Sequence, residues 1–241
     1  MDRTTTIIPG RGLGNRLLSI AITHLLYKSP SIGWHVNHEC RAEWKDLFTA
    51  PAIDIHSCNE RDYRLFADRV NSIKSIKDKM HNILASSYNK AEKPASLTSF
   101  YQSLKPSKKV NKYILDIPPN TLGLHLRFQD HLQLHSESFY LDRVQKLYND
   151  LGKPKVFICS DTQFKKNEIV KLFPEDKLII NYTILSNTIK AGQESEDRNL
   201  LGGMQLATSE MFTLSKCAWI APNSVSSFSM SSFFMGDASL L

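Results

Sequence analysis

Short apolar runs alternate along the chain with longer stretches in which apolar residues recur every three or four positions. The short runs predict buried strands, and the longer stretches predict amphipathic helices. The predicted strands are residues 4–8, 32–36, 53–55, 122–127, 155–159, 177–180 and 218–221. The predicted helices are residues 17–27, 42–48, 62–88, 139–151, 163–173 and 198–215. Strands and helices that alternate through two successive halves predict an α/β protein with two Rossmann-like lobes.

The boundary between the two lobes is predicted from a change in composition. Residues 90–112 are rich in Ser, Lys and Pro and show little apolar periodicity outside 97–104. Such segments usually connect folded units. We therefore expect an N-terminal lobe over residues 1–110 and a C-terminal lobe over residues 111–241.

The segment 121–130 carries the most informative chemistry. Its first half alternates apolar residues with Gly123 and His125, and it ends on Arg127 and Asp130. Ligands in open α/β sheets bind at the carboxyl ends of strands, and an arginine there offers a planar fork of donors that matches phosphate oxygens. Arg127 is therefore the first candidate for a phosphate ligand. The alternative is an ion pair between Arg127 and Asp130, with His125 as a core histidine.

Composition narrows the classes of ligand and compartment. The formal net charge is +6, but Lys and Arg are spread widely, which favours nucleotides over a nucleic-acid track. The four cysteines lie far apart and form no Cys-x-x-Cys pair, so reduced thiols in the cytoplasm are expected. The sequence shows neither the order of a signal peptide nor an apolar run long enough to span a membrane.

A glycine-containing segment separates the first predicted strand from the first predicted helix. It reads Pro-Gly-Arg-Gly-Leu-Gly-Asn-Arg over residues 9–16. Glycines allow close approach of a ligand, and a helix amino terminus presents free N–H groups to an anion. The spacing differs from the dinucleotide fingerprint, because Asn15 stands where a third glycine is needed after Gly10 and Gly12. A tight turn without a ligand is the alternative.

Four separated stretches then match one pattern in the same order: residues 10–17, 125–130, 157–161 and 210–233. On these stretches the chain resembles the fucosyltransferase superfamily, which includes α1,2- and α1,6-fucosyltransferases and protein O-fucosyltransferases. The resemblance implies the GT-B fold, in which two Rossmann-like lobes face a cleft. It places residues 1–110 on the acceptor side and gives residues 111–241 the binding of the nucleotide-sugar donor. The chain is short for that fold and stops soon after the last stretch, which suggests a compact, truncated version.

The resemblance implies a set of donor-binding residues. Arg127 matches the arginine of the family's His-x-Arg motif, which holds the donor's β-phosphate, and His125 is the histidine of that motif. Glu210 falls about where the family has an acidic residue that accepts hydrogen bonds from guanine. The full predicted set is Gly12, Gly14, Asn15, Arg16, His125, Arg127, Asp161, Glu210, Ser226, Ser227, Phe228 and Ser229.

Two departures from the family pattern limit the assignment. Phe128 occupies the position of a second arginine that many members have, which weakens any narrow subfamily assignment. The serine-rich segment has an extra residue after Asn223 and Ser224, so the serine that corresponds to the family's phosphate-binding turn is left open.

The implied reaction is the transfer of fucose from GDP-fucose to a glycan acceptor hydroxyl with inversion. Such a reaction needs charge stabilisation on the departing GDP and a base for the acceptor proton. Arg127 is the expected stabiliser. The base is left open among four residues that follow the strand: Asp130, His131, His135 and Glu137.

No Asp-x-Asp motif occurs in the chain, so metal independence is predicted, with no cofactor beyond the donor substrate GDP-fucose. A zinc site at His131 and His135 is disfavoured because Leu132, and not glutamate, follows the first histidine. Two alternatives stay open: a non-catalytic nucleotide- or phosphosugar-binding module of a larger glycan-assembly protein, and a transferase that uses a different nucleotide sugar. The acceptor and the oligomeric state are not indicated.

Overall fold

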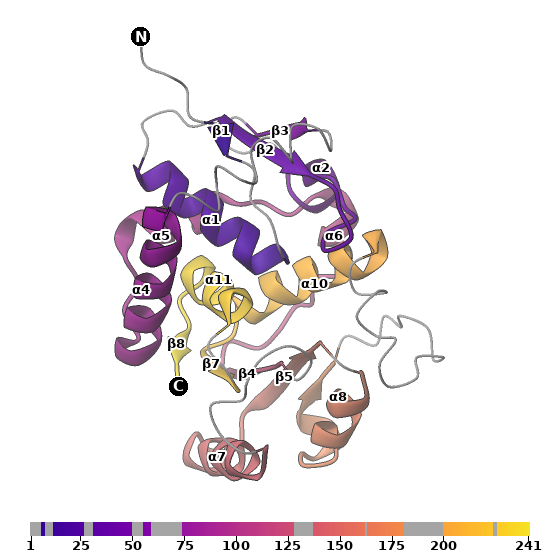
Figure 1. The fold of residues 1–241 in the computed structure, drawn as a ribbon. Coiled ribbons are helices and arrows are strands. Elements are labelled where there is room, and N and C mark those ends of the chain that lie inside the picture. Colours follow the sequence, from indigo (N-terminus) through magenta and orange to yellow (C-terminus); the bar gives the residue numbers. More distant parts are fainter. Residues whose placement is uncertain are drawn as a thin grey trace.

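The computed structural model of the chain describes residues 6–7, 12–26, 31–49, 55–58, 74–127, 137–161, 163–180, 200–223 and 226–241. It contains a three-stranded sheet and a five-stranded sheet, with helices between them (Figure 1). All strand pairs within both sheets are parallel. The predicted α/β fold with two Rossmann-like halves is confirmed.

The N-terminal half is built on the small sheet, with the strand order β1-β2-β3. Its strands are β1 (Thr6–Ile7), β2 (Ser31–His35) and β3 (Ile55–Cys58). Its helices are α1 (Leu13–Leu26), α2 (Trp44–Leu47), α4 (Lys74–Lys90), α5 (Ala95–Ser103) and α6 (Lys108–Asn111). Trp34 and Trp44 are buried, and their rings meet edge to face.

The C-terminal half is built on the larger sheet, with the order β6-β5-β4-β7-β8. Its strands are β4 (Thr121–Leu126), β5 (Lys155–Ser160), β6 (Leu178–Ile179), β7 (Trp219–Pro222) and β8 (Ser239–Leu240). Its helices are α7 (Glu137–Asp150), α8 (Gln163–Val170), a 3₁₀ turn (Glu175–Lys177), α10 (Leu201–Leu214) and α11 (Ser227–Met235). The chain runs outward from β4 through β5 to β6, then returns to add β7 and β8 on the other side of β4. This reversal creates a topological switch point between β4 and β7, where open α/β sheets bind ligands.

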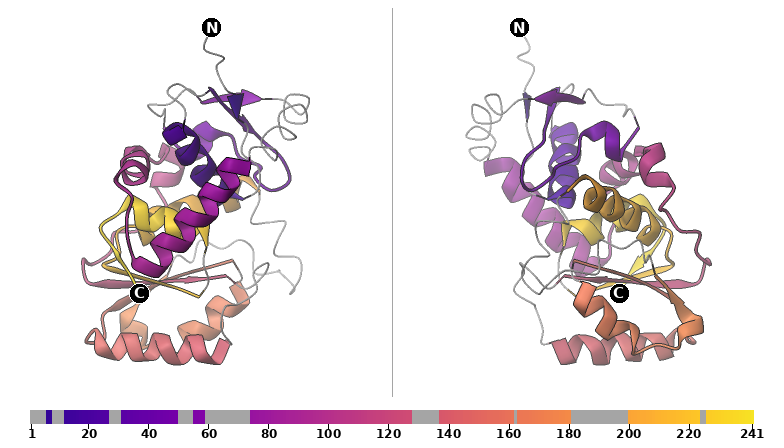
Figure 2. Two further views of the ribbon diagram at one scale, coloured as in Figure 1. Left: turned by 60° about the vertical axis from the view of Figure 1, so that its left-hand side comes forward. Right: turned by 90° about the vertical axis from the view of Figure 1, so that its right-hand side faces the viewer.

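Side-chain alternation along β4 assigns the two faces of the large sheet. Leu122, Leu124 and Leu126 pack in one buried cluster with residues of α7 and α8. Gly123 points the other way, where an added Cβ would collide with Leu214 of α10 and would lie 2.8 Å from the Cys217 Sγ. His125 shares that second face. The predicted strand is therefore buried on both faces, and its odd-numbered positions face the helices that lie between the two sheets (Figure 2).

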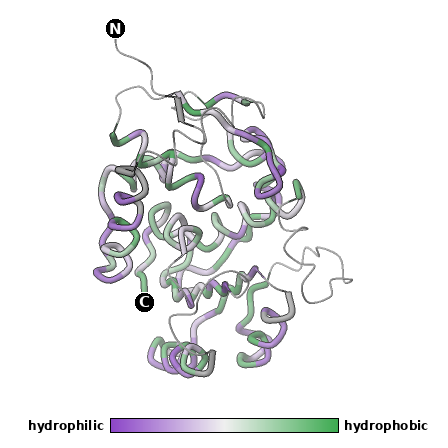
Figure 3. Tube along the Cα trace, in the orientation of Figure 1, coloured by the Kyte–Doolittle hydropathy of each residue, from purple (hydrophilic) through white to green (hydrophobic). Residues whose placement is uncertain are grey.

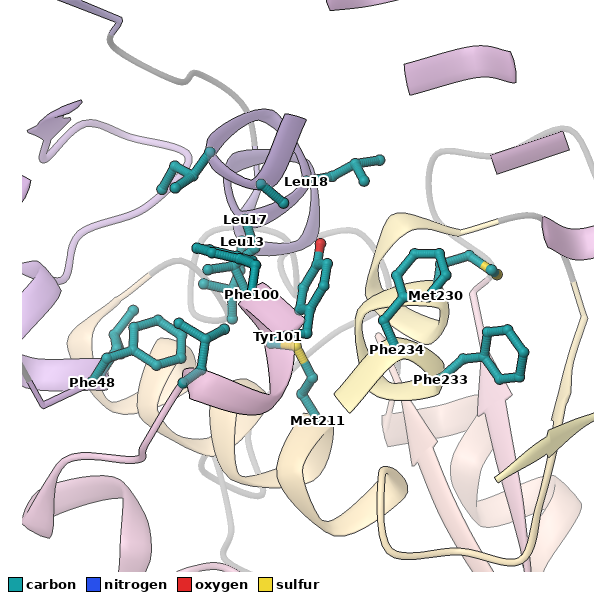
Figure 4. Close-up of a cluster of buried hydrophobic side chains, with 14 of the residues drawn as sticks. Leu13, Leu17, Leu18, Phe48, Phe100, Tyr101, Met211, Met230, Phe233 and Phe234 are labelled. Atoms are coloured by element: carbon teal, nitrogen blue, oxygen red, sulfur yellow. The ribbon is translucent and has the colours of Figure 1, made fainter. Parts of the chain in front are cut away.

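One hydrophobic core extends through both halves. It joins apolar residues of α1 and α5 to those of α10, α11 and β5. Figure 4 shows part of it, where Leu17, Phe100 and Tyr101 of the N-terminal half approach Met211 and Phe234. The buried Tyr101 hydroxyl is satisfied by the Ser231 hydroxyl, 3.2 Å away. The proposed boundary between residues 1–110 and 111–241 falls inside α6 and stays a proposal.

Several element boundaries differ from the predictions. Helix α1 begins at Leu13 and not at residue 17, so Gly14 lies in its first turn and not in a loop. Helix α11 likewise begins at Ser227, inside the segment expected to be a turn. Strand β8 was not predicted because two residues carry no periodicity. The predicted helix over 62–88 is described from Lys74 onward, and the earlier part lies outside the described residues.

Helix α4 has the mixed surface expected of a helix at the edge of a core. Hydrophilic and hydrophobic residues are interspersed along it, as they are along α7 (Figure 3).

Within the ranges that the structure describes, no helix combines the length and apolar character needed to cross a membrane.

Candidate functional site

The candidate site lies at the carboxyl edge of the five-stranded sheet. Strands β4, β5 and β7 end side by side, and Arg127, Asp161 and Asn223 directly follow their last residues. The Asp161 N–H donates to the Leu126 carbonyl at 3.2 Å, and the Asn223 N–H donates to the His125 carbonyl at 3.1 Å. Backbone pairing thus continues past the strand ends and brings Arg127 and Asn223 together at the topological switch point.

The Asn223 side chain fixes the backbone of Arg127. Its Oδ1 accepts a hydrogen bond from the Arg127 N–H at 2.8 Å, and its Nδ2 donates to the Arg127 carbonyl at 3.1 Å. Asn223 is buried and Arg127 is half-buried, so both bonds are partly shielded from water. The half-buried Arg127 guanidinium donates from Nη1 to the Ser226 Oγ at 3.3 Å. Asn223 was not among the predicted site residues.

The amino terminus of α11 meets Arg127 at this point. Ser226 caps the helix, because its Oγ also accepts the Phe228 N–H at 3.3 Å. The Ser229 hydroxyl donates to the Ser226 carbonyl at 3.0 Å and has no exposed surface. Of the four predicted residues in this segment, Ser226 is therefore the one that the structure bonds to Arg127.

Gly14 joins the glycine segment to α11. A Cβ added at Gly14 would lie 2.6 Å from the Phe228 backbone N and 2.7 Å from the Ser227 carbonyl carbon, closer than real Cβ atoms approach. Helices α1 and α11 can therefore cross at this distance only with glycine at position 14. A Cβ at Gly12 would meet nothing within 4 Å. Asn15 is half-buried in the first turn of α1, where its carbonyl accepts the Ser19 hydroxyl at 2.8 Å.

Arg16 is fully buried in the N-terminal half. Its guanidinium donates to the His35 carbonyl at 2.6 Å and to the Asn37 Oδ1 at 2.8 Å. It also lies over the Trp34 ring, 5.1 Å from the ring centroid. Arg16 has no exposed surface in this structure, and its role in donor binding stays a prediction.

His125 packs against the first turn of α11. Its ring is buried and stacks on the half-buried Phe228 ring with centroids 4.9 Å apart and planes at 24°. The ring thereby links the end of β4 to the same helix terminus that Arg127 contacts.

Glu210 of α10 lies in a buried ion pair. Its Oε1 is 3.1 Å from the Nζ of Lys166 on α8, and both side chains are almost wholly buried. Burial raises the pKa of the Glu210 carboxyl, and the Lys166 charge acts in the opposite direction. Lys166 was not predicted as a site residue.

The candidates for the general base are not placed by the structure. Asp130, His131 and His135 lie outside the described residues, and of Glu137 only the backbone at the start of α7 is described. Over the residues that are described, no group of three or more His, Cys, Asp and Glu is arranged to hold a metal ion.

A cavity of about 280 Å³ opens elsewhere in the molecule. Leu104, Lys105, Phe212 and Lys216 are among its lining residues, and none of the predicted site residues belongs to that lining. The candidate site is therefore defined by strand ends and a helix terminus, and not by this cavity.

Comparison with solved structures identifies the architecture. The chain aligns with NodZ α1,6-fucosyltransferase co-crystallised with GDP at a TM-score of 0.58 and 15% identity, over 97% of this chain and 93% of that chain. The fold is similar to that of known fucosyltransferases. NodZ from Bradyrhizobium aligns at a TM-score of 0.57 and 15% identity, over 97% and 94% of the two chains. POFUT1 in complex with GDP aligns at 0.52 and 12% identity, over 100% and 99%.

The sequence comparisons add nothing to this result. No family model matches the sequence, and the search of curated proteins finds no significant match. The resemblance on four short stretches is confirmed at the level of the fold.

Proposed function

We propose that this protein is an inverting, metal-independent glycosyltransferase that moves fucose from GDP-fucose to a glycan acceptor hydroxyl. The observation that carries the proposal is the contact between the Arg127 guanidinium and Ser226 at the start of α11, at the switch point of the large sheet. The similarity to fold relatives that were crystallised with GDP or GDP-fucose supports the choice of donor.

The donor diphosphate is proposed to lie between Arg127 and the amino terminus of α11. A planar guanidinium and the free N–H groups of a helix terminus both favour phosphate oxygens. In the reaction the acceptor oxygen attacks C1 of fucose, the bond from C1 to the β-phosphate oxygen breaks, and GDP departs with the electron pair. Arg127 stabilises the negative charge that develops on GDP. The acceptor proton passes to a base among Asp130, His131, His135 and Glu137.

Glu210 is proposed to accept hydrogen bonds from guanine. Guanine presents two adjacent N–H donors on one edge, and the two oxygens of a carboxylate match them. Glu210 lies on α10, which covers the face of the sheet shared by His125.

Calorimetry and a turnover assay test the proposal together. Binding of GDP should be at least about tenfold tighter than binding of UDP or ADP, because only guanine offers both N–H donors to Glu210. Incubation with GDP-fucose should release GDP and, with a suitable glycan, give a product heavier by one fucose in mass spectrometry. Binding without hydrolysis or transfer would instead favour a non-catalytic module, and preference for another nucleotide would point to a different donor sugar.

Activity is expected to survive removal of divalent metal ions. The proposed charge stabilisation comes from Arg127 and from the helix terminus, so no step requires a metal. Turnover of GDP-fucose should be unchanged within error after dialysis against EDTA. Loss of turnover that Mg²⁺ or Mn²⁺ restores would contradict the proposal of metal independence.

Asn223→Ala is expected to lower turnover and also to cost some stability. The substitution leaves the N–H and carbonyl of Arg127 without their side-chain partner, at roughly 1–3 kcal/mol per buried group left unsatisfied. We expect kcat for GDP-fucose to fall more than the affinity for GDP, because the guanidinium loses its orientation. Asn149→Ala, on the exposed surface of α7, is the matched control. Equal kcat in the two variants would contradict a positioning role for Asn223.

A further inference from the structure

The ion pair between Lys166 and Glu210 connects the two layers that cover opposite faces of the large sheet. Helix α8 carries Lys166, and its Ile169 belongs to the cluster below the sheet. Helix α10 carries Glu210, and its Met211 belongs to the core above the sheet. The side chains of Lys166 and Glu210 keep only 5% and 10% of their surface exposed. Two charges from different layers are thus buried against each other.

This ion pair lies beneath the edge that carries Arg127. Leu214 of α10 contacts Gly123, and Glu210 is one helical turn, about 5.4 Å, nearer the amino end of the helix. Helix α10 leads through a short turn into β7, which is parallel to β4, so α10 runs back along the sheet. The helical turn that carries Glu210 therefore lies at about the level of His125 and its register partner Cys159. Burial first, and then the Glu210 charge, raise the pKa of the Cys159 thiol, which agrees with this placement.

Stability alone gives little reason to keep such a pair. Removing two charges from water is costly, and buried ion pairs can often be replaced by apolar residues without loss of stability. The pair has a specific chemical effect, however. Burial favours the protonated form of Glu210, and Lys166 at 3.1 Å favours the ionised form.

We propose that Lys166 is a positioning residue that keeps Glu210 ionised and oriented toward a base with two adjacent N–H donors, and that it thereby sets the base selectivity of the donor site. This inference rests on the proposed function. An ionised carboxylate has about four lone-pair sites, so it can accept from Lys166 and still accept from two N–H groups. A protonated carboxyl places an O–H donor against one of those N–H groups, and the match is lost.

The test is calorimetry of GDP, inosine diphosphate and ADP with wild-type protein and Lys166→Met, from pH 6 to pH 9. Inosine diphosphate lacks the 2-amino group, so the ratio of GDP to inosine diphosphate affinity reports the second N–H contact. In wild type we expect a ratio of about ten or more, because hydrogen bonds to charged groups are strong. In Lys166→Met we expect a ratio below that of wild type at pH 6, and we expect it to increase as the pH rises.

The pH dependence follows from the groups that face Glu210. Lys166 on α8 favours the ionised form of Glu210, the Glu210 charge in turn raises the pKa of the Cys159 thiol on β5, and His125 lies in register with Cys159 on the neighbouring strand. Without Lys166, burial leaves the carboxyl protonated to a higher pH. Raising the pH therefore restores the charge and the preference for GDP. In wild type the ratio of GDP to inosine diphosphate affinity should change less with pH.

A double-mutant cycle separates this role from a structural one. Glu210→Gln alone should abolish the preference for GDP over inosine diphosphate, and adding Lys166→Met should cause no further change, because Lys166 acts through Glu210. Lys146→Met, on the exposed face of α7, is the matched control and should keep the wild-type ratio. Lys166→Arg keeps the positive charge and should retain part of the wild-type ratio of GDP to inosine diphosphate affinity. This variant provides the test if Lys166→Met does not fold.

Two outcomes would overturn the inference. In the first outcome, wild type prefers GDP, and Lys166→Met weakens the binding of all three nucleotides equally, without a change in the ratio of their affinities or in its pH dependence. The ion pair is then only a structural link between α8 and α10. If wild type shows no preference for GDP, the proposed function fails as well. The two failures are distinguished by the wild-type measurement.

Discussion

Arg127→Ala is expected to lower turnover of GDP-fucose by about 100-fold to 1,000-fold. Removing one preorganised donor from a developing negative charge typically costs about 2.7–4 kcal/mol in the barrier. Arg127 is well suited to that role, because Asn223 holds its backbone and Ser226 orients its guanidinium. The affinity for GDP should fall less than kcat, since the departing diphosphate carries more charge than the bound donor. Steady-state kinetics with a GDP-release assay measure both quantities.

Two further variants sharpen this result. Arg127→Lys keeps the charge but loses the planar fork, so intermediate turnover is expected. Arg41→Ala removes an exposed arginine of the N-terminal half and should leave turnover unchanged. Turnover of Arg127→Ala within a few-fold of wild type would exclude Arg127 as the residue that stabilises the leaving group.

Gly14→Ala is expected to destabilise the fold and to weaken donor binding at the same time. The new Cβ would lie within 2.6–2.8 Å of the Ser227 and Phe228 atoms at the start of α11, two of them backbone atoms that cannot move alone. Overpacking of this kind costs typically about 1–3 kcal/mol. For a chain of this size that corresponds to a fall in melting temperature of roughly 2–4 °C per kcal/mol. Because α11 must move, its amino terminus also moves relative to Arg127.

Gly12→Ala is the matched control for stability, because its added Cβ meets nothing within 4 Å. Its melting temperature should stay close to that of wild type. Thermal unfolding and GDP calorimetry on the two variants test the account. Equal stability and equal GDP affinity for Gly14→Ala and wild type would show that α1 and α11 do not meet in solution as the structure places them.

The sequence predicts the backbone of the site well because its signals are local. Alternation over 122–127 predicts a buried strand, and the structure has β4 over Thr121–Leu126. Arg127 is the last residue of the predicted strand, and in the structure it directly follows β4. The carboxyl ends of parallel strands meet at one edge, so its place at the edge of the sheet follows from strand type alone.

The helix starts were wrong where glycine and serine were read as turn residues. Gly14 belongs to α1 because the contact with α11 requires a residue without a side chain. Ser227 belongs to α11 because Ser226 caps the helix one residue earlier. The contact at Gly14 depends on a neighbouring element, whereas the Ser226 cap is a local signal, and hydrophobic periodicity reveals neither of them.

The partners of the site residues could not be predicted for a related reason. Asn223 is 96 residues from Arg127, and Lys166 is 44 residues from Glu210. Only the order of the five strands brings these pairs together. Lys166 lies in α8 next to Lys165, and nothing in the sequence distinguishes the two lysines until the burial of Lys166 is known.

The most direct test of the central claim is a crystal structure of this chain soaked with GDP. The account predicts that the β-phosphate lies within hydrogen-bond distance of the Arg127 guanidinium, at the amino terminus of α11 and beside Ser226. A well-ordered nucleotide bound at another place, or an Arg127 side chain directed away from the diphosphate, would contradict the account.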